Sequence, residues 1–517
     1  MRAAASGLAF VCVASAVASA VALAAASRVA AQDLRTQAGE RPNVILLVVD
    51  DLDVSSLHAA AAAGYLPNLV EHVGAGGTEF TESFVTLSLC CPSRATALTG
   101  QYGHNHGVIR NTGPSGGFER FDDGSTLATW LSGAGYHTGH VGKYLIGYRD
   151  PGYVPPGWDD WQALVDPTTY CMYDYALSDN GSPVAYGSAV ADYQTDVLAG
   201  RADDFIREWH ERGDTRPFFL SLAPLAPHLE SACEPLRVRP APRHEDTAAL
   251  PLPRPPSFNE QEMGDKPTWM QRLPLLPEAT LQAAYADRIA SLRAVDDMVG
   301  RLALRLRAIG AGERTAVFFT SDNGYLLGQH RWPSKVLMYE ESIRVPLIVR
   351  LPWAAQRPSV AQIALNNDLA PTIAALAGVE PGLVMDGRSL LPLLQGDASS
   401  WRRRFLVEYP PVPPDPAPTG SGASIAKPID DNDLLPFFAV RTGSADGEPS
   451  LVYGETLDAT GTEVTHVEHY DLALDPFQLH SLHDDLSPAR VLQRRVLDQH
   501  LQRLKVCGAG SCQGAEE

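Results

Sequence analysis

The sequence predicts an α/β fold in which helices flank a large mixed, mainly parallel sheet, with a smaller antiparallel sheet toward the C-terminus. Three continuous apolar runs of strand length, at residues 43–49, 217–222 and 315–320, carry this prediction. A run that is apolar at every position is typical of a strand buried on both faces, as in the centre of a parallel sheet. Long segments with helical patterns separate the runs, which is the order of elements that α/β domains show.

Helical periodicity predicts two long helices, at residues 195–212 and 277–309, because their apolar side chains recur every three to four positions. A shorter helix is expected at 125–134. Residues 135–144 are expected to form a strand. Residues 150–190 are rich in Gly, Pro, Tyr and Trp, and we expect irregular loops there that form a wall of a cleft.

The character of the chain changes near Trp401. Short strand candidates follow a helix that ends near Gly378, and a helix at 488–505 closes the chain. We therefore predict a large α/β domain over residues 40–400 and a smaller α+β subdomain over 401–517. The four strand candidates of the subdomain are residues 405–409, 437–442, 450–454 and 465–470, with a Pro-, Gly- and Ser-rich loop at 410–433.

The first 31 residues have the features of a secretory signal peptide. Arg2 precedes an Ala-rich apolar run at residues 3–26, and Val29-Ala30-Ala31 offers the small residues that a signal peptidase requires. An uncleaved membrane anchor is the alternative, because the run is long enough to span a bilayer. The alanine content and the cleavage motif favour removal after Ala31 and export. We expect no other segment to span a membrane and no stable membrane partner.

The chain is strongly acidic, with 41 basic and 61 acidic residues and a formal net charge of −20. Removal of Arg2 and Arg28 with the leader brings the charge to −22. Such a protein binds nucleic acid or an anionic membrane poorly, so neither is expected as a partner. An anionic substrate would have to be attracted by a local basic pocket or by a metal ion.

Six of the seven cysteines remain after the leader is removed. Cys507 and Cys512 flank a Gly-Ala-Gly-Ser segment and can close a small terminal loop. A pair between Cys171 and Cys233 is a looser prediction.

Acidic residues follow two of the predicted central strands. Asp50 and Asp51 end the first apolar run, and Asp322 and Asn323 follow the run at 315–320. Alone, the first pair would be read as capping of a helix N-terminus, and Asp322-Asn323-Gly324 as an ordinary turn. Together they supply three carboxylates and an amide at the strand ends where open α/β sheets bind ligands. Such hard oxygen donors suit Ca²⁺ or Mg²⁺ rather than a soft metal.

The segment 89–100, Leu-Cys-Cys-Pro-Ser-Arg-Ala-Thr-Ala-Leu-Thr-Gly, is the one around which we organise the function. We predict a tight turn here that leads into the N-terminus of a helix, where free N–H groups favour binding of an anion. On its chemistry alone, Cys90 or Cys91 is either a nucleophile activated by Arg94 or a buried cysteine before a helix.

The pattern Cys90-x-Pro92-Ser93-Arg94, followed by Leu-Thr-Gly at 98–100, resembles the signature of the type I sulfatases. In that family the first cysteine is oxidised to formylglycine. The resemblance extends over nearly the whole mature chain and implies an alkaline-phosphatase-like fold. It also implies a formylglycine-generating enzyme as a partner during maturation. If Cys90 is modified, five cysteines remain, and an odd number cannot all pair.

The resemblance implies a role for each basic residue of the site. The hydrate of the formylglycine made from Cys90 attacks sulfur with one hydroxyl and later expels sulfate with the other. Arg94 orients that hydrate, Lys143 and Lys335 hold the sulfuryl oxygens, and His228 or Lys335 protonates the leaving oxygen. The implied metal ligands are Asp50, Asp51, modified Cys90, Asp322 and Asn323, with Ca²⁺ expected and Mg²⁺ as the alternative.

Three further histidines are candidate substrate contacts by the same resemblance: His104 and His106 in a His-Asn-His triplet, and His330 near the second lysine. A solvated loop is the plainer reading of the triplet. The chain departs from many arylsulfatases at Leu145, where they carry a histidine bonded to formylglycine. This variant, with the double cysteine and the triplet, is closest to the N-acetylglucosamine-6-sulfatase branch.

The expected activity is therefore hydrolysis of a sulfate monoester on a small molecule or glycan, of the glucosamine 6-sulfate or glycosaminoglycan type. An arylsulfatase, or a phosphonate or phosphate monoester hydrolase of the same superfamily, is the alternative within catalysis. Phosphatases of the superfamily usually bind two metals, and only one strong ligand set is visible in this sequence. A secreted sulfoglycan-binding protein that never matures its cysteine is the non-catalytic alternative.

Overall fold

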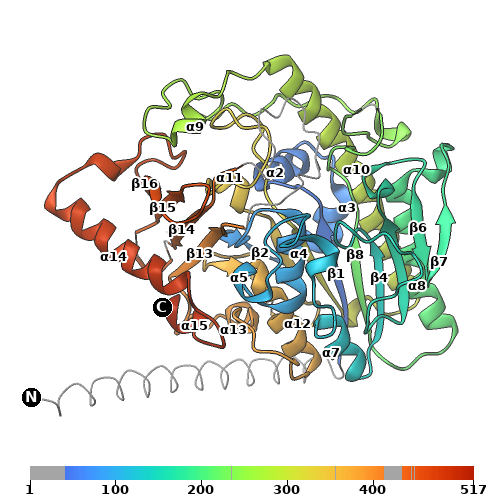
Figure 1. Ribbon diagram of the computed structural model, residues 1–517. Helices are drawn as coiled ribbons and strands as arrows, with labels where there is room; N and C mark the ends of the chain where they lie inside the picture. Colours follow the sequence, from blue (N-terminus) through green and yellow to red (C-terminus); the bar gives the residue numbers. More distant parts are fainter. Residues whose placement is uncertain (1–40, 235, 356, 413–433, 444, 448) are drawn as a thin grey trace, which may run out of the picture.

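The computed structural model describes residues 41–517 except 235, 356, 413–433, 444 and 448 (Figure 1). The predicted signal peptide lies outside the described residues, as does most of the predicted loop at 410–433. Within the described part of the chain, no helix combines the length and the apolar character that crossing a bilayer requires.

A ten-stranded sheet forms the centre of the molecule, in the order β11-β2-β10-β9-β1-β8-β4-β5-β6-β7. The five strands from β9 to β5 run parallel to one another, and the neighbours β10 and β6 are antiparallel to them. The strands are β1 (Asn43–Val49), β2 (Thr78–Phe80), β4 (His137–Gly142), β5 (Asp160–Val165), β6 (Ala176–Asp179), β7 (Ser182–Ala185), β8 (Phe218–Ala223), β9 (Thr315–Ser321), β10 (Leu347–Arg350) and β11 (Ser359–Val360).

Helices cover both faces of this sheet, as Figure 1 shows. Alternate residues of β1 enter two separate cores: Ile45 and Leu47 pack with one set of helices, and Val44 and Leu46 pack with the other. This explains why β1 is apolar at each position from 44 to 49. The first set is α2 (Val54–Ala62), α8 (Gln194–Glu211) and α10 (Glu278–Ala308), and the second is α4 (Cys90–Thr99), α7 (Leu127–Gly133) and α12 (Leu369–Ala377).

A second, four-stranded antiparallel sheet lies near the C-terminus, in the order β13-β14-β15-β16. Its strands are β13 (Arg404–Tyr409), β14 (Phe437–Thr442), β15 (Leu451–Leu457) and β16 (Val464–Asp471), and α14 (Pro488–Leu504) packs on it through Leu497, Leu501 and Leu504. The remaining short elements are α3 (Pro67–Leu69), α5 (Gly103–His106), α6 (Gly117–Arg120), α9 (Thr268–Gln271), α11 (Glu340–Ile343), α13 (Leu391–Gln395), α15 (Cys512–Ala515), β3 (Ser83–Phe84) and β12 (Ala364–Leu365). The predicted fold class, with its small antiparallel sheet, is confirmed.

The expectation of irregular loops at residues 150–190 is wrong, because this stretch contributes β5, β6 and β7 to the large sheet. Asn180 and Gly181 join β6 to β7 with φ values of 49° and 86°. An Asn-Gly pair with positive φ at both positions is the preferred two-residue hairpin turn. The Asn-Gly pair was therefore the signal for this hairpin, and the surrounding Gly, Pro and Tyr obscured it.

Both predicted cysteine pairs are confirmed as disulfides, between Cys171 and Cys233 and between Cys507 and Cys512. Cys90 and Cys91 are buried thiols. If Cys90 is modified, Cys91 is therefore the one remaining cysteine without a disulfide partner.

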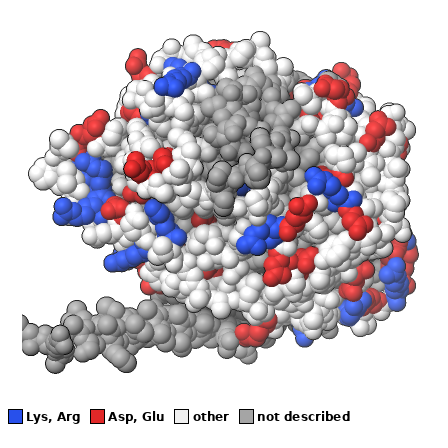
Figure 2. Space-filling view, in the orientation of Figure 1, with Lys and Arg blue, Asp and Glu red and all other residues white. Residues whose placement is uncertain are grey.

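Acidic and basic side chains are interspersed over the described part of the face in Figure 2. This distribution agrees with the expectation that an anionic substrate needs local positive charge.

A buried carboxylate, Glu516, fixes the C-terminus to the large domain. Its Oε2 lies 2.9 Å from Arg402 Nε and 3.3 Å from Arg388 Nε, and its Oε1 accepts a hydrogen bond of 2.7 Å from the Tyr102 hydroxyl. Arg402 also pairs with Asp368, and none of these carboxylates and guanidinium groups is exposed to more than a few per cent. The tail therefore depends on a network in which every charge has a partner.

We predict that Glu516→Gln lowers the free energy of unfolding by about 3–5 kcal/mol, because it leaves Arg388 and Arg402 with too little compensating charge in a buried site. Urea unfolding followed by circular dichroism measures the change. Glu517→Gln is the matched control, since the neighbouring Glu517 side chain is 39% exposed. Equal losses in the two variants would contradict the buried network.

Candidate active site

The candidate site forms where parallel strands of the large sheet end. Asp50 follows β1, Lys143 follows β4, and Asp322 follows β9, while His228 lies five residues beyond the end of β8. Because these strands are parallel neighbours, their carboxyl ends lie at one edge of the sheet, where open α/β sheets bind ligands.

The two predicted pairs of metal ligands, at residues 50–51 and 322–323, lie together because β1 and β9 pair in register, with Val49 beside Ser321. The backbone N–H of Asp51 donates to Asp322 Oδ1 over 3.1 Å, and Asn323 Nδ2 donates to Asp51 Oδ1 over 2.7 Å. Asp51 has a φ of 62°, which L-residues other than Asn and Asp rarely adopt. The turn after β1 is thus shaped to keep both carboxylates in the cluster.

Gly142 determines how Lys143 enters the cluster. Its φ is 114°, and a Cβ at this position would lie 2.2 Å from the carbonyl oxygen of Ala223, so only glycine fits. The Lys143 ammonium then contacts Asp50 Oδ2 at 2.5 Å. The predicted lysine at this strand end is therefore a buried partner of a predicted metal ligand, not a solvated strand end.

Cys90 is the first residue of α4, as the predicted turn and helix require. The N–H of Cys91 in the first turn donates to Asn111 Oδ1 over 2.9 Å, and Gly100 ends the helix with a φ of 72°. Burial raises the pKa of the Cys90 thiol and outweighs Lys143 and Lys335. A protonated, buried thiol is a weak nucleophile, so an unmodified Cys90 does not suit nucleophilic catalysis.

Arg94 lies one turn further along α4 and joins three parts of the cluster. Its Nε and Nη2 lie 2.9 Å and 2.8 Å from Asp322 Oδ2, and its Nη1 donates to the carbonyl of Lys143 over 3.0 Å. This planar, multidentate contact fixes the helix that carries Cys90 against the ends of β4 and β9.

Lys335 enters from the loop after β9. The next residue, Val336, has a φ of 74°, which is exceptional for a β-branched side chain and marks a strained turn. The Lys335 ammonium hydrogen-bonds Asp51 Oδ1 and lies 3.0 Å from Cys90 Sγ. The strained loop therefore places a cation directly beside the predicted nucleophile.

The residues of the cluster fit a divalent cation. Asn323 Oδ1 is a buried acceptor that has no hydrogen-bond partner in the described structure. Burial raises the pKa of Asp322 to about 6, and the charge of Asp50 adds to this effect. Three carboxylates face three cationic side chains, so an added divalent ion would leave the site positive and complementary to an anionic ester.

His228 also belongs to the cluster, because one ligand atom each from Asp50, Asp51, Cys90 and His228 lies within 4.8 Å of the others. Its Nδ1 lies 2.6 Å from the carbonyl oxygen of Leu229, which makes Nδ1 the protonated nitrogen, and Nε2 lies 3.4 Å from Asp51 Oδ2. Burial lowers the pKa of His228. Its Nε2 therefore faces the cluster as a lone pair rather than as a proton donor.

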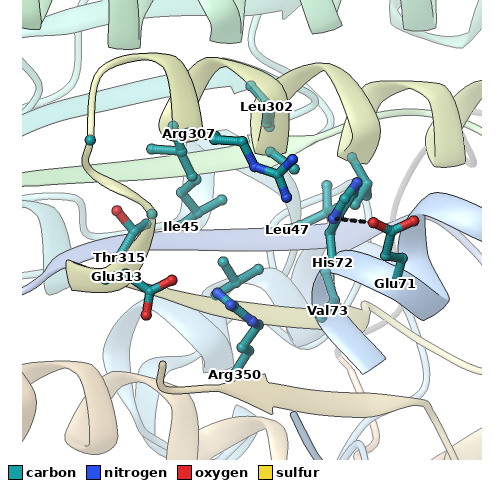
Figure 3. A pocket seen from close by; sticks show the side chains of 16 residues that line it. Ile45, Leu47, Glu71, His72, Val73, Leu302, Arg307, Glu313, Thr315 and Arg350 are labelled. Carbon is teal, nitrogen blue, oxygen red and sulfur yellow. Dashed lines mark ion pairs between the residues drawn. The ribbon is translucent and has the colours of Figure 1, made fainter. Parts of the chain in front are cut away.

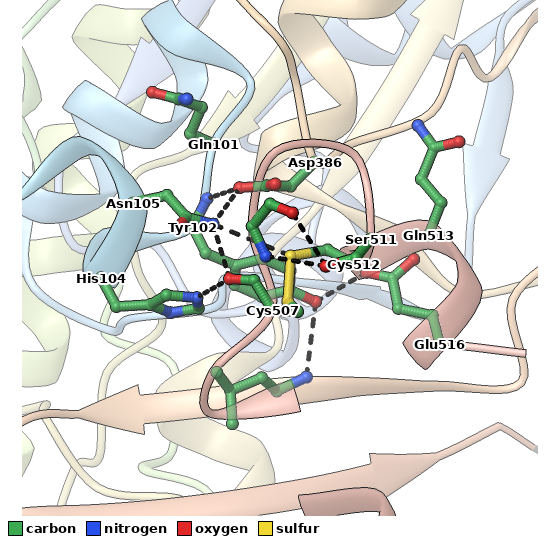
Figure 4. The surroundings of a disulfide bond; sticks show 12 residues. Gln101, Tyr102, His104, Asn105, Asp386, Cys507, Ser511, Cys512, Gln513 and Glu516 are labelled. Carbon is green, nitrogen blue, oxygen red and sulfur yellow. Dashed lines mark hydrogen bonds between the residues drawn. A yellow bond between two sulfur atoms is a disulfide. The ribbon is translucent and has the colours of Figure 1, made fainter. Parts of the chain in front are cut away.

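The three other histidines contact different groups. His104 Nδ1 lies 2.8 Å from Glu408 Oε2, and its Nε2 lies 2.9 Å from the carbonyl oxygen of Cys507, beside the disulfide to Cys512 (Figure 4). His106 Nε2 lies 2.9 Å from the hydroxyl of Thr96.

His330 is fully buried, and its Nδ1 lies 2.6 Å from Glu260 Oε2 while its ring stacks on Tyr339. The structure thus brings together Asp50, Asp51, Cys90, Arg94, Lys143, His228, Asp322, Asn323 and Lys335, but it engages His104, His106 and His330 elsewhere.

Two residues of the site are absent from the sequence predictions. The ring centre of Tyr170 lies 4.7 Å from Lys143 Nζ and 4.9 Å from the His228 ring. Arg288 of α10 is buried and donates to the backbone carbonyls of Asp51 and Pro227. Arg288 falls among the apolar positions of its helix. A charged residue on a buried helix face was the signal that could have identified it as part of the site. Nothing in the local sequence distinguishes Tyr170 from its aromatic neighbours.

Comparison with known proteins agrees with this geometry. The family model described as Sulfatase matches residues 42–379. The N-acetylglucosamine-6-sulfatase of Homo sapiens is 33% identical over 500 residues, covering 91% of this chain and 86% of the relative. An arylsulfatase of Volvox carteri is 34% identical over 406 residues, covering 72% of this chain and 61% of the relative.

A solved structure of a protein in complex with its substrate D-glucosamine-2-N,6-O-disulfate superposes with a TM-score of 0.69 at 23% identity, covering 91% of this chain and 99% of the other. This confirms the predicted alkaline-phosphatase-like architecture. The chain belongs to the sulfatase family. It is accordingly a sulfuric ester hydrolase.

We predict that Asp322→Asn weakens binding of Ca²⁺ at least about tenfold, because it removes one of the charges that offset the cation and loosens the contact with Arg94. Isothermal titration with Ca²⁺ and with Mg²⁺ after dialysis against a chelator measures the affinity. Asp53→Asn is the control, since Asp53 follows the same strand but caps α2 through the Ser56 N–H, and Asn caps equally well. Unchanged affinity in Asp322→Asn would exclude this carboxylate from the metal site.

The ion pair between His104 and Glu408 predicts a pH-dependent stability. Burial alone would lower the pKa of His104, but Glu408 raises it from 6.5 to about 9. The stabilisation is fully present below pH 6.5 and is lost as the pH rises through about 9. We expect His104→Gln to cost about 2–3 kcal/mol in free energy of unfolding at pH 7 and almost nothing at pH 10.

Urea unfolding at the two pH values tests this. His106→Gln is the control, because burial lowers the pKa of His106 to about 3 and the imidazole is neutral throughout this range. A loss for His104→Gln that does not change between pH 7 and pH 10 would contradict the ion pair.

Proposed function

We propose that the protein hydrolyses the sulfate monoester of a sulfated sugar, of the glucosamine 6-sulfate or glycosaminoglycan type. The observation that carries the proposal is the position of Cys90, at the first residue of α4 and 3.0 Å from the Lys335 ammonium. The name of the human relative and the substrate of the similar solved structure support a sulfated glucosamine. An aryl sulfate is the second candidate, favoured by the relative from Volvox carteri.

We propose formylglycine, made from Cys90, as the nucleophilic group, whose hydrate supplies a hydroxyl for attack on sulfur and a second hydroxyl for the later release of sulfate. Lys143 and Lys335 bind the sulfuryl oxygens and offset their negative charge, which would otherwise repel the incoming nucleophile. Arg94 supports the nucleophile from its own helix, while its contact with Asp322 keeps its guanidinium in place.

We propose Lys335 rather than His228 as the proton donor to the leaving oxygen. Burial would lower the pKa of Lys335, but the charge of Asp51 raises it well above the usual value, so Lys335 carries the proton that the leaving oxygen needs. The Nε2 of His228 bears no proton when its Nδ1 donates to Leu229. This division of roles leaves His228 to contribute to the metal site through the lone pair of Nε2.

Ca²⁺ is the metal that we propose for the site, with Mg²⁺ as the alternative. Asp50, Asp51, Asp322 and Asn323 would hold it, and its charge would polarise the ester and the nucleophile. Asn323 contributes an amide oxygen and Asp51 a carboxylate from a strained turn. Such an irregular set of oxygens suits the flexible coordination of Ca²⁺ better than the strict octahedron of Mg²⁺.

We further propose that the protein is exported through its N-terminal leader and that a formylglycine-generating enzyme modifies it. The signal-peptide pattern of residues 1–31 supports export. The cysteine-proline-arginine pattern at 90–94 supports the modification, and the two disulfides agree with an oxidising compartment.

The test is peptide mass spectrometry across residue 90, combined with sulfate-release assays on the same preparation, expressed with a formylglycine-generating system. We expect an aldehyde at position 90 and release of sulfate in proportion to its occupancy. The panel contains N-acetylglucosamine 6-sulfate, sulfated glycosaminoglycan fragments, an aryl sulfate and a phosphonate monoester.

Cys90→Ala should abolish turnover, at least about 10⁴-fold, because no nucleophile remains. Cys91→Ala is the matched control, since the Cys91 sulfur only accepts a hydrogen bond of 3.1 Å from the Ile146 N–H. Binding of sulfated glycans without any release of sulfate would replace the proposal with a binding function. Preferred turnover of the phosphonate would assign the site to the related phosphonate hydrolases.

A further inference from the structure

A cavity of about 340 Å³ lies between α10 and the large sheet, away from the active site (Figure 3). Ile45 and Leu47 of β1 and Thr315 and Val317 of β9 line it. Both strands end in the acidic cluster, so the cavity adjoins the earlier part of the same two strands. Its volume falls in the range of small-molecule sites in proteins.

The floor of this cavity is apolar. Ile45, Leu47, Leu302 and Leu306 line it, and each is no more than 6% exposed. Hydroxyl groups of a sugar would find few hydrogen-bond partners against these side chains and would lose hydration there. The cavity therefore suits an apolar body and not the sulfated sugar proposed for the active site.

Two arginines converge on the cavity from opposite sides. Arg307 projects from α10 and Arg350 from β10, as Figure 3 shows. Neither guanidinium group has an ion pair or a hydrogen-bond partner among the described residues. The other charged groups at the rim are Glu71, which lies 3.9 Å from His72 Nδ1, and Glu313. Two unpaired guanidinium groups in a protein of net charge −20 favour an anionic head group.

We propose that this cavity binds a small amphipathic organic anion, with a body of one or two apolar rings and a single carboxylate or sulfonate. The rings rest on the leucines of α10 and on the apolar side chains of β1. The anionic group lies between Arg307 and Arg350, where it can accept charge-assisted hydrogen bonds from both. The limited volume excludes a folded partner and favours a compact ligand.

The probe for the test is 8-anilinonaphthalene-1-sulfonate, which combines an aromatic body with one sulfonate. We expect one molecule to bind per chain in a fluorescence titration confirmed by calorimetry. The double substitution Arg307→Gln and Arg350→Gln should weaken binding at least about tenfold, because the head group loses both charged partners. Ala303→Trp should abolish it, because Ala303 lines the cavity and the indole would fill it.

Arg272→Gln is the matched control, since Arg272 is exposed and lies outside the cavity. Thermal unfolding must show that each variant is folded. Lys335→Gln should leave the titration unchanged, which separates this site from the active-site cluster that contains Lys335. The uncharged analogue N-phenyl-1-naphthylamine should bind at least about tenfold more weakly.

Equal binding to the wild type, the arginine variant and Ala303→Trp would overturn the proposal, as would loss of binding in Lys335→Gln. Loss of binding in Ala303→Trp alone, with no effect of the arginines, would refute an anionic ligand. A dimer that Ala303→Trp dissociates in analytical ultracentrifugation would identify the cavity as an interface between copies, which also overturns the proposal.

Discussion

The parallel pairing of β1 with β9 is the constraint on which the site depends. With Val49 opposite Ser321, the residues after both strands meet, and three carboxylates lie together in the protein interior. Like charges at this distance are costly unless cations offset them. Cations from three different segments offset that cost: Arg94 comes from α4, Lys143 directly follows β4, and Lys335 comes from a strained loop.

The same electrostatics connect stability and catalysis. Burial would raise the pKa of Asp50, but Lys143 and Arg94 lower it far below its usual value, so this carboxylate remains ionised in the interior. The lysines that neutralise the acids in the structure are those proposed to bind the sulfuryl group. A cation that binds the carboxylates would free these ammonium groups for substrate, and the negative charge of the sulfate ester would offset part of the charge that the metal adds.

The elements that the sequence specified locally were predictable. Residues 44–49 of β1 and 316–319 of β9 are uninterrupted apolar runs, and α4 begins and ends with recognisable turn residues, so the strand ends and the helix start were assigned within one or two positions. The role of His104 was not predictable, because its partners, Glu408 and Cys507, lie more than 300 residues away in the sequence. Arg288 and Tyr170 were missed for the same reason: their contacts with the site exist only after distant segments pack.

The depth of Cys90, which is 1% exposed, sets an order of events during biosynthesis. An enzyme that modifies this side chain must reach it before α4 packs against the sheet. The cluster closes only when β9 joins β1, and β9 begins 225 residues after Cys90. At roughly 5–20 residues per second, translation leaves about 10–45 s between the two. The topology thus provides an interval in which the cysteine stays accessible on a growing chain.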